Sequence, residues 1–311
     1  MKTIFEFKTL TEFTDYFCDE ETCVAHFTAS RFRNGEYCPH CRHDKIYKCG
    51  NGRRYQCAKC KQDFTIRTGT VFGESKLPLR KWYMAVYLLS TTSKGISSVQ
   101  LAKHIGVTQK TAWFMAHRIR AAKSQAVTKL SGRIEADETY IGGKVPNMSK
   151  SRRRKFAGQT GGAGKTPLVG ILQRGGEIQV KVAEAVNRQT LVPNIIENVQ
   201  KGSFVYTDEN VCYRGLHRAG FIHNQVQHQT KEYVVGDCHT NSIESFWALF
   251  KRGYHGVYHH MSKKHLQRYV NEFTFRFNRR ACEMQSVFSN VVNNVVQTPQ
   301  LPYKELIGKN V

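Results

Sequence analysis

The stretch SGRIEADETYIGG, residues 131–143, decides the fold of this 311-residue sequence. Its apolar and β-branched residues predict a strand that ends in acidic side chains. Hydrophobic patterning beyond this stretch predicts, in chain order, a strand at PLVGILQR (167–174), a strand at EIQVKVAEAV (177–186), a helix over 189–199, a strand at SFVYTDEN (203–210), a strand at NQVQHQT (224–230) and a long helical region opening with HTNSIESFWALFKRG (239–253). Three neighbouring strands therefore precede a helix, further strands and a last helical region.

This order predicts an α/β fold of the RNase H-like class, in which a mixed sheet presents acids against a helix. Asp137, Asp208 and Glu244 each lie at a predicted strand end or helix start. Clustered carboxylates raise one another's pKa unless cations lie between them, and their hard oxygens suit Mg²⁺ or Mn²⁺. Two such ions can activate the attacking oxygen and stabilise the leaving one in a displacement at phosphorus. The three acids therefore predict phosphoryl transfer.

Each of these acids, taken alone, is better explained as a surface cap. Because a strand alternates its faces, Glu135 shares a face with Asp137 whereas Glu138 points away. Glu135 is therefore the main competitor of Asp137 for the catalytic role.

Four cysteines before residue 61 form a second pattern. Cys38, Cys41, Cys57 and Cys60 follow the spacing C-x2-C-x15-C-x2-C, which is that of a four-thiolate zinc site. The segment YKCGNGRRYQ between the pairs predicts two strands joined by a turn. The sequence therefore predicts a zinc ribbon, in which the metal replaces an apolar core.

The charge and the segment after the ribbon indicate DNA as the partner. Lys and Arg number 47 against 24 Asp and Glu, giving a net charge of +23, which favours a polyanion. The segment 96–122 predicts a helix-turn-helix with a turn at Gly106 and a cap at Thr108. A plain three-helix support is the alternative. In a DNA-binding helix-turn-helix the start of the second helix meets base edges, so the expected contacts are Gln109, Lys110 and Thr111.

Residues 144–166 predict a basic loop between the first two strands of the sheet. The segment is rich in Gly and Ser and carries Arg152, Arg153 and Arg154 without an acid. A loop at this position can lie over the acids and bind the DNA backbone.

Several motifs together carry a family resemblance. ADETYIGGK, VYTDEN and HTNSIESFWALFKRG, after the cysteine pattern and GTVFGESKLPLRKWY, resemble the zinc-ribbon DDE transposases of bacterial insertion sequences, the ISXO2-like group related to the Merlin elements of animals. The resemblance extends over about residues 30–285. It implies binding of terminal inverted repeats, DNA cleavage and joining of the freed 3′-hydroxyl to target DNA.

The same resemblance implies roles for single residues. Asp137, Asp208 and Glu244 would be the catalytic metal ligands, with Asn241 as a possible alternative third ligand. Lys251 follows Glu244 by two helical turns and so lies on the same helix face. Lys251 and the adjacent Arg252 would hold a DNA phosphate.

Two other functions stay open: a non-catalytic zinc-ribbon DNA-binding regulator derived from a transposase, and an RNase H-like nuclease that cuts without joining. The expected organisation is a helical segment (1–30), the zinc ribbon (31–70), the helix-turn-helix module (71–128), the catalytic domain (129–285) and a C-terminal tail (286–311). Because two DNA ends must be brought together, a homodimer or larger assembly is expected. Without a membrane span or export signal, a cytoplasmic, nucleoid-associated bacterial protein is expected.

Overall fold

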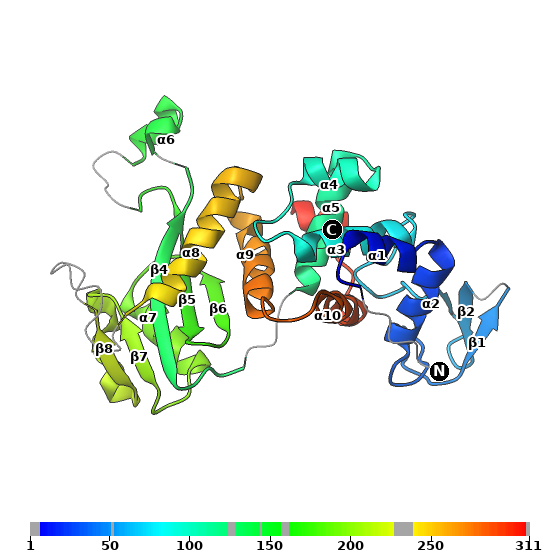
Figure 1. Cartoon of the computed structure of the whole chain (residues 1–311), viewed down its shortest axis with the longest axis horizontal. Helices are drawn as coiled ribbons and strands as arrows, with labels where there is room; N and C mark the ends of the chain where they lie inside the picture. The colour runs from blue at the N-terminus through cyan, green and yellow to red at the C-terminus, as the bar shows by residue number, and fades with distance from the viewer. Residues whose placement is uncertain are drawn as a thin grey trace. The chain divides into compact units, whose positions relative to one another are not determined.

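The computed structural model describes residues 7–50, 53–123, 128–143, 145–156, 162–226 and 239–308. The chain divides into two compact units, one made of Met1–Ser124 with Ala281–Val311 and the other of Gln125–Arg280. Figure 1 shows the elements of both units. None of the helices in the described ranges is long and apolar enough to cross a lipid bilayer.

The first unit begins with two helices and the ribbon. Helices α1 (Leu10–Tyr16) and α2 (Glu20–Arg31) precede an antiparallel sheet of β1 (Ile46–Cys49), β2 (Arg54–Cys57) and β3 (Asp63–Phe64). Thr9 and Asp19 cap the two helices, because their side chains accept hydrogen bonds from the backbone N–H groups of Glu12 and Thr22. The buried Arg31 joins α2 to the ribbon by donating to the backbone carbonyl of Thr68 at 2.9 Å.

The predicted helix-turn-helix is present. Helix α3 (Leu79–Thr91) is followed by α4 (Ser98–Ile105) and α5 (Gln109–Ala122). Gly106 ends α4 with φ of 62°, a conformation that glycine adopts without a Cβ clash. Thr108 then caps α5 by accepting from the N–H of Thr111 at 3.2 Å.

The C-terminal residues belong to this first unit as well. They form α10 (Met284–Gln297) and α11 (Tyr303–Ile307). The buried ring of Phe288 on α10 packs against Tyr83 and Phe13, both at 5.3 Å between ring centroids. The segment that the sequence leaves without a role therefore completes the apolar core around α1 and α3.

The second unit is built on a five-stranded mixed sheet. Its strands are β4 (Arg133–Ile141), β5 (Thr166–Gln173), β6 (Ile178–Val182), β7 (Phe204–Thr207) and β8 (Ile222–Gln225). Their order in the sheet is β6-β5-β4-β7-β8, with β4, β5 and β6 antiparallel and β7 and β8 parallel to β4. This order and these directions are those of an RNase H-like sheet, so the predicted fold class is confirmed.

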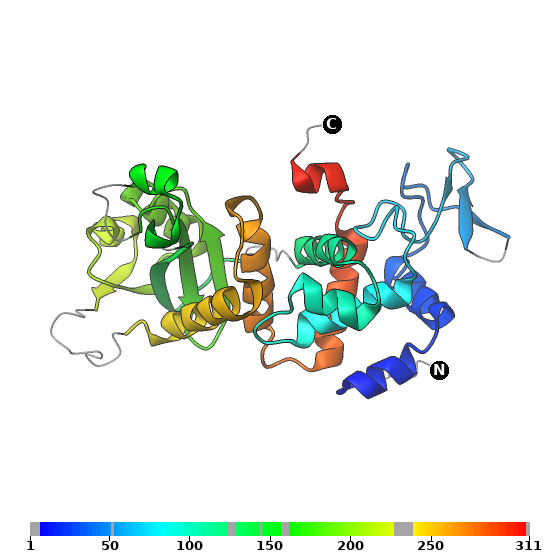
Figure 2. The same cartoon turned by 90° about the horizontal axis from the view of Figure 1, so that it is seen from above.

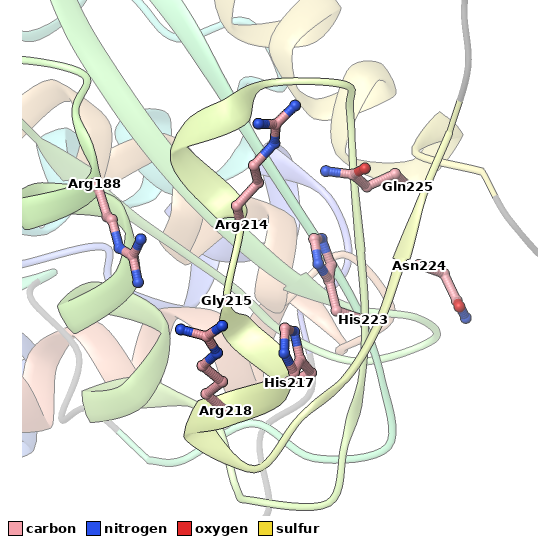
Figure 3. A pocket seen from close by; sticks show the side chains of 8 residues that line it. All are labelled: Arg188, Arg214, Gly215, His217, Arg218, His223, Asn224 and Gln225. Carbon is pink, nitrogen blue, oxygen red and sulfur yellow. The ribbon is translucent and has the colours of Figure 1, made fainter.

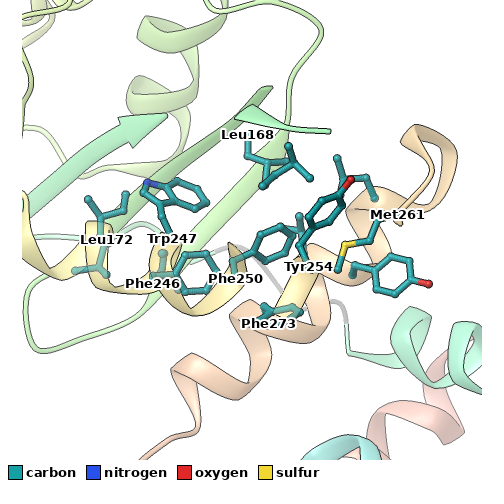
Figure 4. Packing of buried hydrophobic residues seen from close by; sticks show 14 residues of the cluster. Leu168, Leu172, Phe246, Trp247, Phe250, Tyr254, Met261 and Phe273 are labelled. Carbon is teal, nitrogen blue, oxygen red and sulfur yellow. The ribbon is translucent and has the colours of Figure 1, made fainter. Parts of the chain in front are cut away.

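Helices cover both faces of this sheet. Helix α8 (Asn241–Gly253) runs along one face, next to α9 (Lys263–Asn278), as both views of the molecule show (Figures 1 and 2). Apolar side chains from β5 and both helices, Leu168, Phe246 and Phe273 among them, form one cluster there (Figure 4). A second cluster lies on the opposite face, against α7 (Arg188–Asn198). The central strands β4 and β5 are therefore enclosed between two apolar layers.

Two predictions differ from the structure in detail. The predicted basic loop contains a 3₁₀ turn, η1 (Val145–Asn147), and a short helix, α6 (Lys150–Arg154), which stands clear of the sheet in Figure 1. Lys and Arg are good helix formers, so this segment can form a helical turn. The backbone N–H of Arg153 donates to the carbonyl oxygen of Ser149 in that turn. The predicted strand at 224–230 is observed at Ile222–Gln225, and residues 227–230 of that prediction lie outside the described ranges.

Candidate active site

Asp137 lies on β4, and Asp208 directly follows the adjacent strand β7. Strand β7 pairs with β4 only as far as Glu135, opposite Tyr206. Continuing this parallel register by two residues puts Asp208, just beyond the end of β7, opposite Asp137. Neighbouring strands lie about 4.8 Å apart, so the two carboxyl groups are neighbours. Asp137 is not at the end of its strand, as the sequence predicted, but in the middle of the nine-residue β4, where β7 no longer pairs with it.

The surroundings of Asp137 disfavour its charge. Burial raises the pKa of its carboxyl group to about 7, and the nearby acids Glu138 and Asp208 act in the same direction. The indole N–H of Trp247 on α8 donates to Oδ2 of Asp137 at 3.0 Å. The site therefore holds a carboxyl group that keeps its negative charge most easily when a cation is present.

Gly170 makes the contact between α8 and Asp137 possible. It lies directly opposite Asp137 in the antiparallel pair of β4 and β5. A Cβ atom at this position would lie 2.7 Å from Cζ2 of Trp247 and 3.0 Å from Cδ1 of Ile243. Because glycine lacks that atom, the indole ring can approach the strand closely, and Figure 4 shows Trp247 between α8 and the sheet. A glycine within an apolar strand is the sequence signal for such a close approach.

Glu135, the expected competitor of Asp137, has a different role. It is fully buried and accepts from Nε of Arg174 at 2.8 Å. The backbone N–H of Ile243, in the first turn of α8, donates to its other oxygen at 2.9 Å. Glu135 thus fixes the start of α8 against the sheet, and its two oxygens are occupied by protein donors.

Glu138 lies on the opposite face of β4, as the alternation predicts, yet it takes part in the acidic group. Tyr213 donates to its Oε2 at 2.7 Å, and the side-chain amide of Asn210 donates to Oε1. Burial raises the pKa of Glu138, and the charge of Asp208 adds to this effect. The acid that the structure brings to Asp137 and Asp208 is therefore Glu138, which sequence reasoning set aside.

Glu244 lies at the exposed start of α8, where its Oε1 accepts from the hydroxyl group of Thr240 at 2.9 Å. Asn241, the alternative third ligand, is the exposed first residue of the same helix. Within the part of the chain that the structure describes, no three acidic side chains have oxygen atoms within 4.8 Å of one another. Glu244 is therefore not part of a three-acid cluster among the described residues, and its carboxylate accepts from Thr240.

The position of Glu244 on α8 nevertheless points to the same region. Glu244, Trp247 and Lys251 are spaced at i, i+3 and i+7, so they share one face of the helix. Trp247 on that face contacts Asp137, whereas Lys251 and its neighbour Arg252 are exposed in the last turn.

The remaining predicted DNA contacts lie in two other places. Gln109 donates to the hydroxyl group of Ser98 at 2.8 Å, Thr111 bonds to Thr108, and the ammonium group of Lys110 lies 5.2 Å from the ring centre of Tyr303. The helix α6 carries Arg152, Arg153 and Arg154, and the side chains of the last two are exposed.

The four predicted cysteine ligands converge in the ribbon. Their sulfur atoms all lie within 4.8 Å of one another, with 3.7 Å between Cys38 and Cys60 and 3.5 Å between Cys41 and Cys57. These separations match the edge of a tetrahedron with Zn–S bonds of about 2.3 Å. Burial acts to raise the pKa of the Cys57 thiol, but backbone N–H donors of Cys60 and Lys59 outweigh it and lower that pKa to about 6. The predicted zinc site is thus confirmed by the geometry of its donors.

A zinc ribbon followed by an RNase H-like sheet with paired aspartates is the arrangement expected of a transposase-type protein, and comparison with known families agrees. The ISXO2-like transposase domain matches residues 129–278, and the transposase zinc-ribbon domain matches residues 18–63. The chain is 33% identical over 257 residues to an uncharacterized protein in transposable element ISH50 of Halobacterium salinarum, covering 79% of this chain and 86% of that protein. The chain belongs to the ISXO2-like transposase family.

Two further similarities are weaker. An uncharacterized transposase-like protein of Haemophilus influenzae is 30% identical over 109 residues, which cover 35% of this chain and 87% of that protein. A chain in the crystal structure of a pre-cleavage Mos1 transpososome aligns with 66% of this chain and 75% of its own length, at 12% identity. Its TM-score of 0.28 is too low to support a conclusion about this chain.

Proposed function

We propose that this transposase binds the terminal inverted repeats of an insertion sequence, cleaves the DNA ends and joins the freed 3′-hydroxyl group to target DNA. The catalytic ligands would be Asp137, Asp208 and Glu244. The observation that carries the proposal is the pair of adjacent aspartates in a half-buried site, where burial, with the neighbouring acids acting in the same direction, raises the pKa of Asp137 to about 7. DNA as partner would also make the bacterial nucleoid its place of action.

The donor set fits divalent metal ions of the magnesium type. Mg²⁺ and Mn²⁺ prefer hard oxygen ligands, and the carboxylates of Asp137 and Asp208 supply them next to each other. When bound, two such ions would supply charge neutralisation and Lewis-acid activation at phosphorus. Glu244 shares the helix face of Trp247. A change in the side-chain rotamer of Glu244 would therefore bring its carboxylate towards Asp137 and Asp208.

The residues around the acids would orient them and the DNA. Trp247 donates to one oxygen of Asp137, and the backbone N–H of Asn210 donates to Oδ1 of Asp208 at 3.1 Å. Both bonds restrict the carboxyl groups while leaving other lone pairs available. Lys251, exposed on the same helix face, would contact the phosphate backbone.

A strand-transfer assay tests this function. The substrate is a labelled duplex that carries the inverted repeat flanking the gene, incubated with target DNA and Mg²⁺ or Mn²⁺. We expect a product covalently joined to the target. The single variants Asp137→Asn, Asp208→Asn and Glu244→Gln should lower joining by about a thousandfold or more, because each removes several kcal/mol of transition-state stabilisation. End binding should persist in all three.

The same assay separates the alternatives. Binding without cleavage would identify a regulator, and cleavage without joining would identify a nuclease. Comparing Glu138→Gln with Glu244→Gln tests which glutamate is the third metal ligand. If Glu138→Gln abolishes joining and Glu244→Gln does not, Glu138 replaces Glu244 in the proposal. Glu184→Gln, which alters an exposed carboxylate beyond β6, controls for the loss of charge.

A further inference from the structure

A basic pocket lies beside the edge strand β8 in the second unit. Its volume is about 500 Å³, and its lining includes Arg188, Arg214, Arg218, His217 and His223. Arg188 is the first residue of α7, and His217 and Arg218 belong to η3 (Leu216–Ala219). In Figure 3 the side chains of Arg214 and Gln225 lie at one end of the pocket and those of Arg218 and His217 at the other. No acidic residue is among the described residues that line it.

The backbone is shaped to admit one of these guanidinium groups. Gly215 has φ of 90°, and a Cβ atom there would lie 3.0 Å from Nη2 of Arg188. Glycine therefore provides both the left-handed turn and the space for the side chain of Arg188. Burial, together with His217, lowers the pKa of His223, whereas the three arginines keep their positive charge.

The pocket is one strand away from the acidic site. Gln225, at the end of β8, pairs with Thr207, the residue before Asp208. The imidazole Nε2 of His223 and the hydroxyl group of Thr207 are 2.9 Å apart, and that hydroxyl group also donates to the carbonyl oxygen of Asp208 at 2.9 Å. Through Thr207, the pocket therefore borders the strand that leads into Asp208.

We propose that this pocket binds a backbone phosphate of the DNA strand whose neighbouring phosphate reacts at Asp137 and Asp208. The inference rests on the proposed function and adds a specific anchor to it. Guanidinium groups match phosphate oxygens by paired hydrogen bonds, and three of them without a carboxylate favour an anionic oxygen group such as a phosphodiester. Arg188, Arg214 and Arg218 are all exposed, which suits a continuous strand passing through the pocket better than an enclosed small anion.

The first test compares two double variants of the full-length, zinc-loaded chain. Arg214→Gln with Arg218→Gln removes two charges from the pocket. Lys129→Gln with Lys201→Gln removes two exposed charges before β4 and β7, at the opposite end of these parallel strands from Asp208. The affinity for a short mixed-sequence duplex is measured without divalent ions between about 50 and 200 mM NaCl.

Loss of the one phosphate contact that the pocket provides should lower the slope of log affinity against log salt by about 0.9 in the pocket variant. The lysine variant should show less than half of this change. Equal changes in both variants, or no change in the pocket variant, would overturn the proposal. Thermal unfolding of each variant establishes that the exposed substitutions leave the fold intact.

The second test needs no substitution. Phenylglyoxal modifies accessible arginines, and peptide mass spectrometry reports the modified positions with and without the duplex. Bound DNA should protect Arg188, Arg214 and Arg218. If the wild-type chain joins strands but these arginines stay equally reactive with DNA bound, the pocket proposal is wrong and the proposed function stands. If they are protected but no strand is cleaved or joined, the proposed function is wrong and the phosphate site stands.

Discussion

The folds of the zinc ribbon and the five-stranded sheet are stabilised in different ways. The strands of the ribbon span two to four residues, and four cysteine sulfurs gather beside them within 4.8 Å of one another. The sheet lies between two apolar clusters, with buried side chains such as Leu168 on one face and Ile171 on the other. Below a certain size an apolar core cannot stabilise a fold alone, so the ribbon depends on metal where the sheet does not.

Metal ligands therefore affect the stability of the two regions in opposite ways. In the ribbon, the ligands are the structural centre, and binding of zinc is coupled to folding. In the sheet, carboxylates have been placed where burial raises the pKa of Asp137 and Glu138, so the folded state is less stable at neutral pH than it would be without them. Metal is therefore needed for the structure of one region and, by our proposal, for the chemistry of the other.

The largest expected effect is the loss of zinc. Cys57→Ser, or a chelator, should unfold the ribbon, because structural zinc contributes about 10–16 kcal/mol in comparable small sites. Circular dichroism and limited proteolysis should show a cleaved ribbon and an intact sheet. Cys49→Ser is the matched control, since Cys49 is in the ribbon but its sulfur faces the carbonyl oxygen of Tyr47. A sheet that unfolds together with the ribbon would contradict the contrast between the two regions.

The second prediction concerns Asp137 and pH. With a pKa of about 7 in the folded protein and about 3.9 in the unfolded chain, Asp137 keeps its proton on folding between these values. The unfolded state releases that proton as pH rises from about 4 to 7, so the stability of the wild-type protein falls over this range and levels off above it. Asp137→Asn cannot titrate and should be more stable than wild type by about 1–4 kcal/mol at pH 8.

Denaturant unfolding of the zinc-loaded protein, without Mg²⁺ and without chelator, measures this difference. The advantage of Asp137→Asn should shrink as pH is lowered from 8 towards 5. Adding Mg²⁺ should stabilise the wild type more than the variant, because the carboxylate is then paired with a cation. Glu184→Gln, at an exposed position, is expected to follow the wild type. An advantage of Asp137→Asn that is independent of pH would show that packing, not ionisation, is responsible.

Local patterns made much of this structure predictable. The C-x-x-C pairs predicted the ribbon because two sulfurs close in sequence are necessarily close in space, and Gly106 with Thr108 predicted the turn between α4 and α5 through their own backbone preferences. The order of strands and helices along the chain followed from runs of apolar residues and one predicted helix between them. Each of these signals is contained within a few residues.

What the sequence did not reveal depends on pairing between distant segments. Glu138 joins the acids because Asn210 and Tyr213, which are 72 and 75 residues away in the chain, donate to its carboxylate. The role of Glu135 depends on Arg174, 39 residues away. The basic pocket combines side chains from α7, η3 and β8, none of which forms a motif by itself. A glycine signal at position 170 was present, but its partner Trp247 lies on a helix much later in the chain.

The smallest effect is expected from Trp247→Phe, which separates packing from positioning in the sheet unit. Phenylalanine keeps part of the apolar contact but leaves a cavity where the larger indole ring was, so the free energy of unfolding should fall by about 1–3 kcal/mol. The variant loses the N–H donor to Asp137, and a lost partner of a metal ligand typically lowers metal affinity or activity about 10- to 100-fold. We therefore expect slower strand transfer and a higher Mg²⁺ concentration for half-maximal activity.

Trp82→Phe is the matched control in the first unit. Trp82 is also buried, and its indole N–H donates to the hydroxyl group of Ser75 at 3.0 Å. Both residues are far in sequence from Asp137 and Asp208. This variant should lose a similar amount of stability but keep the Mg²⁺ dependence of the wild type. Because both substitutions remove one buried indole donor, only a role of Trp247 in orienting Asp137 predicts that they differ in Mg²⁺ dependence. If strand transfer depends on Mg²⁺ concentration in the same way in both variants, Trp247 has only a packing role and does not orient Asp137.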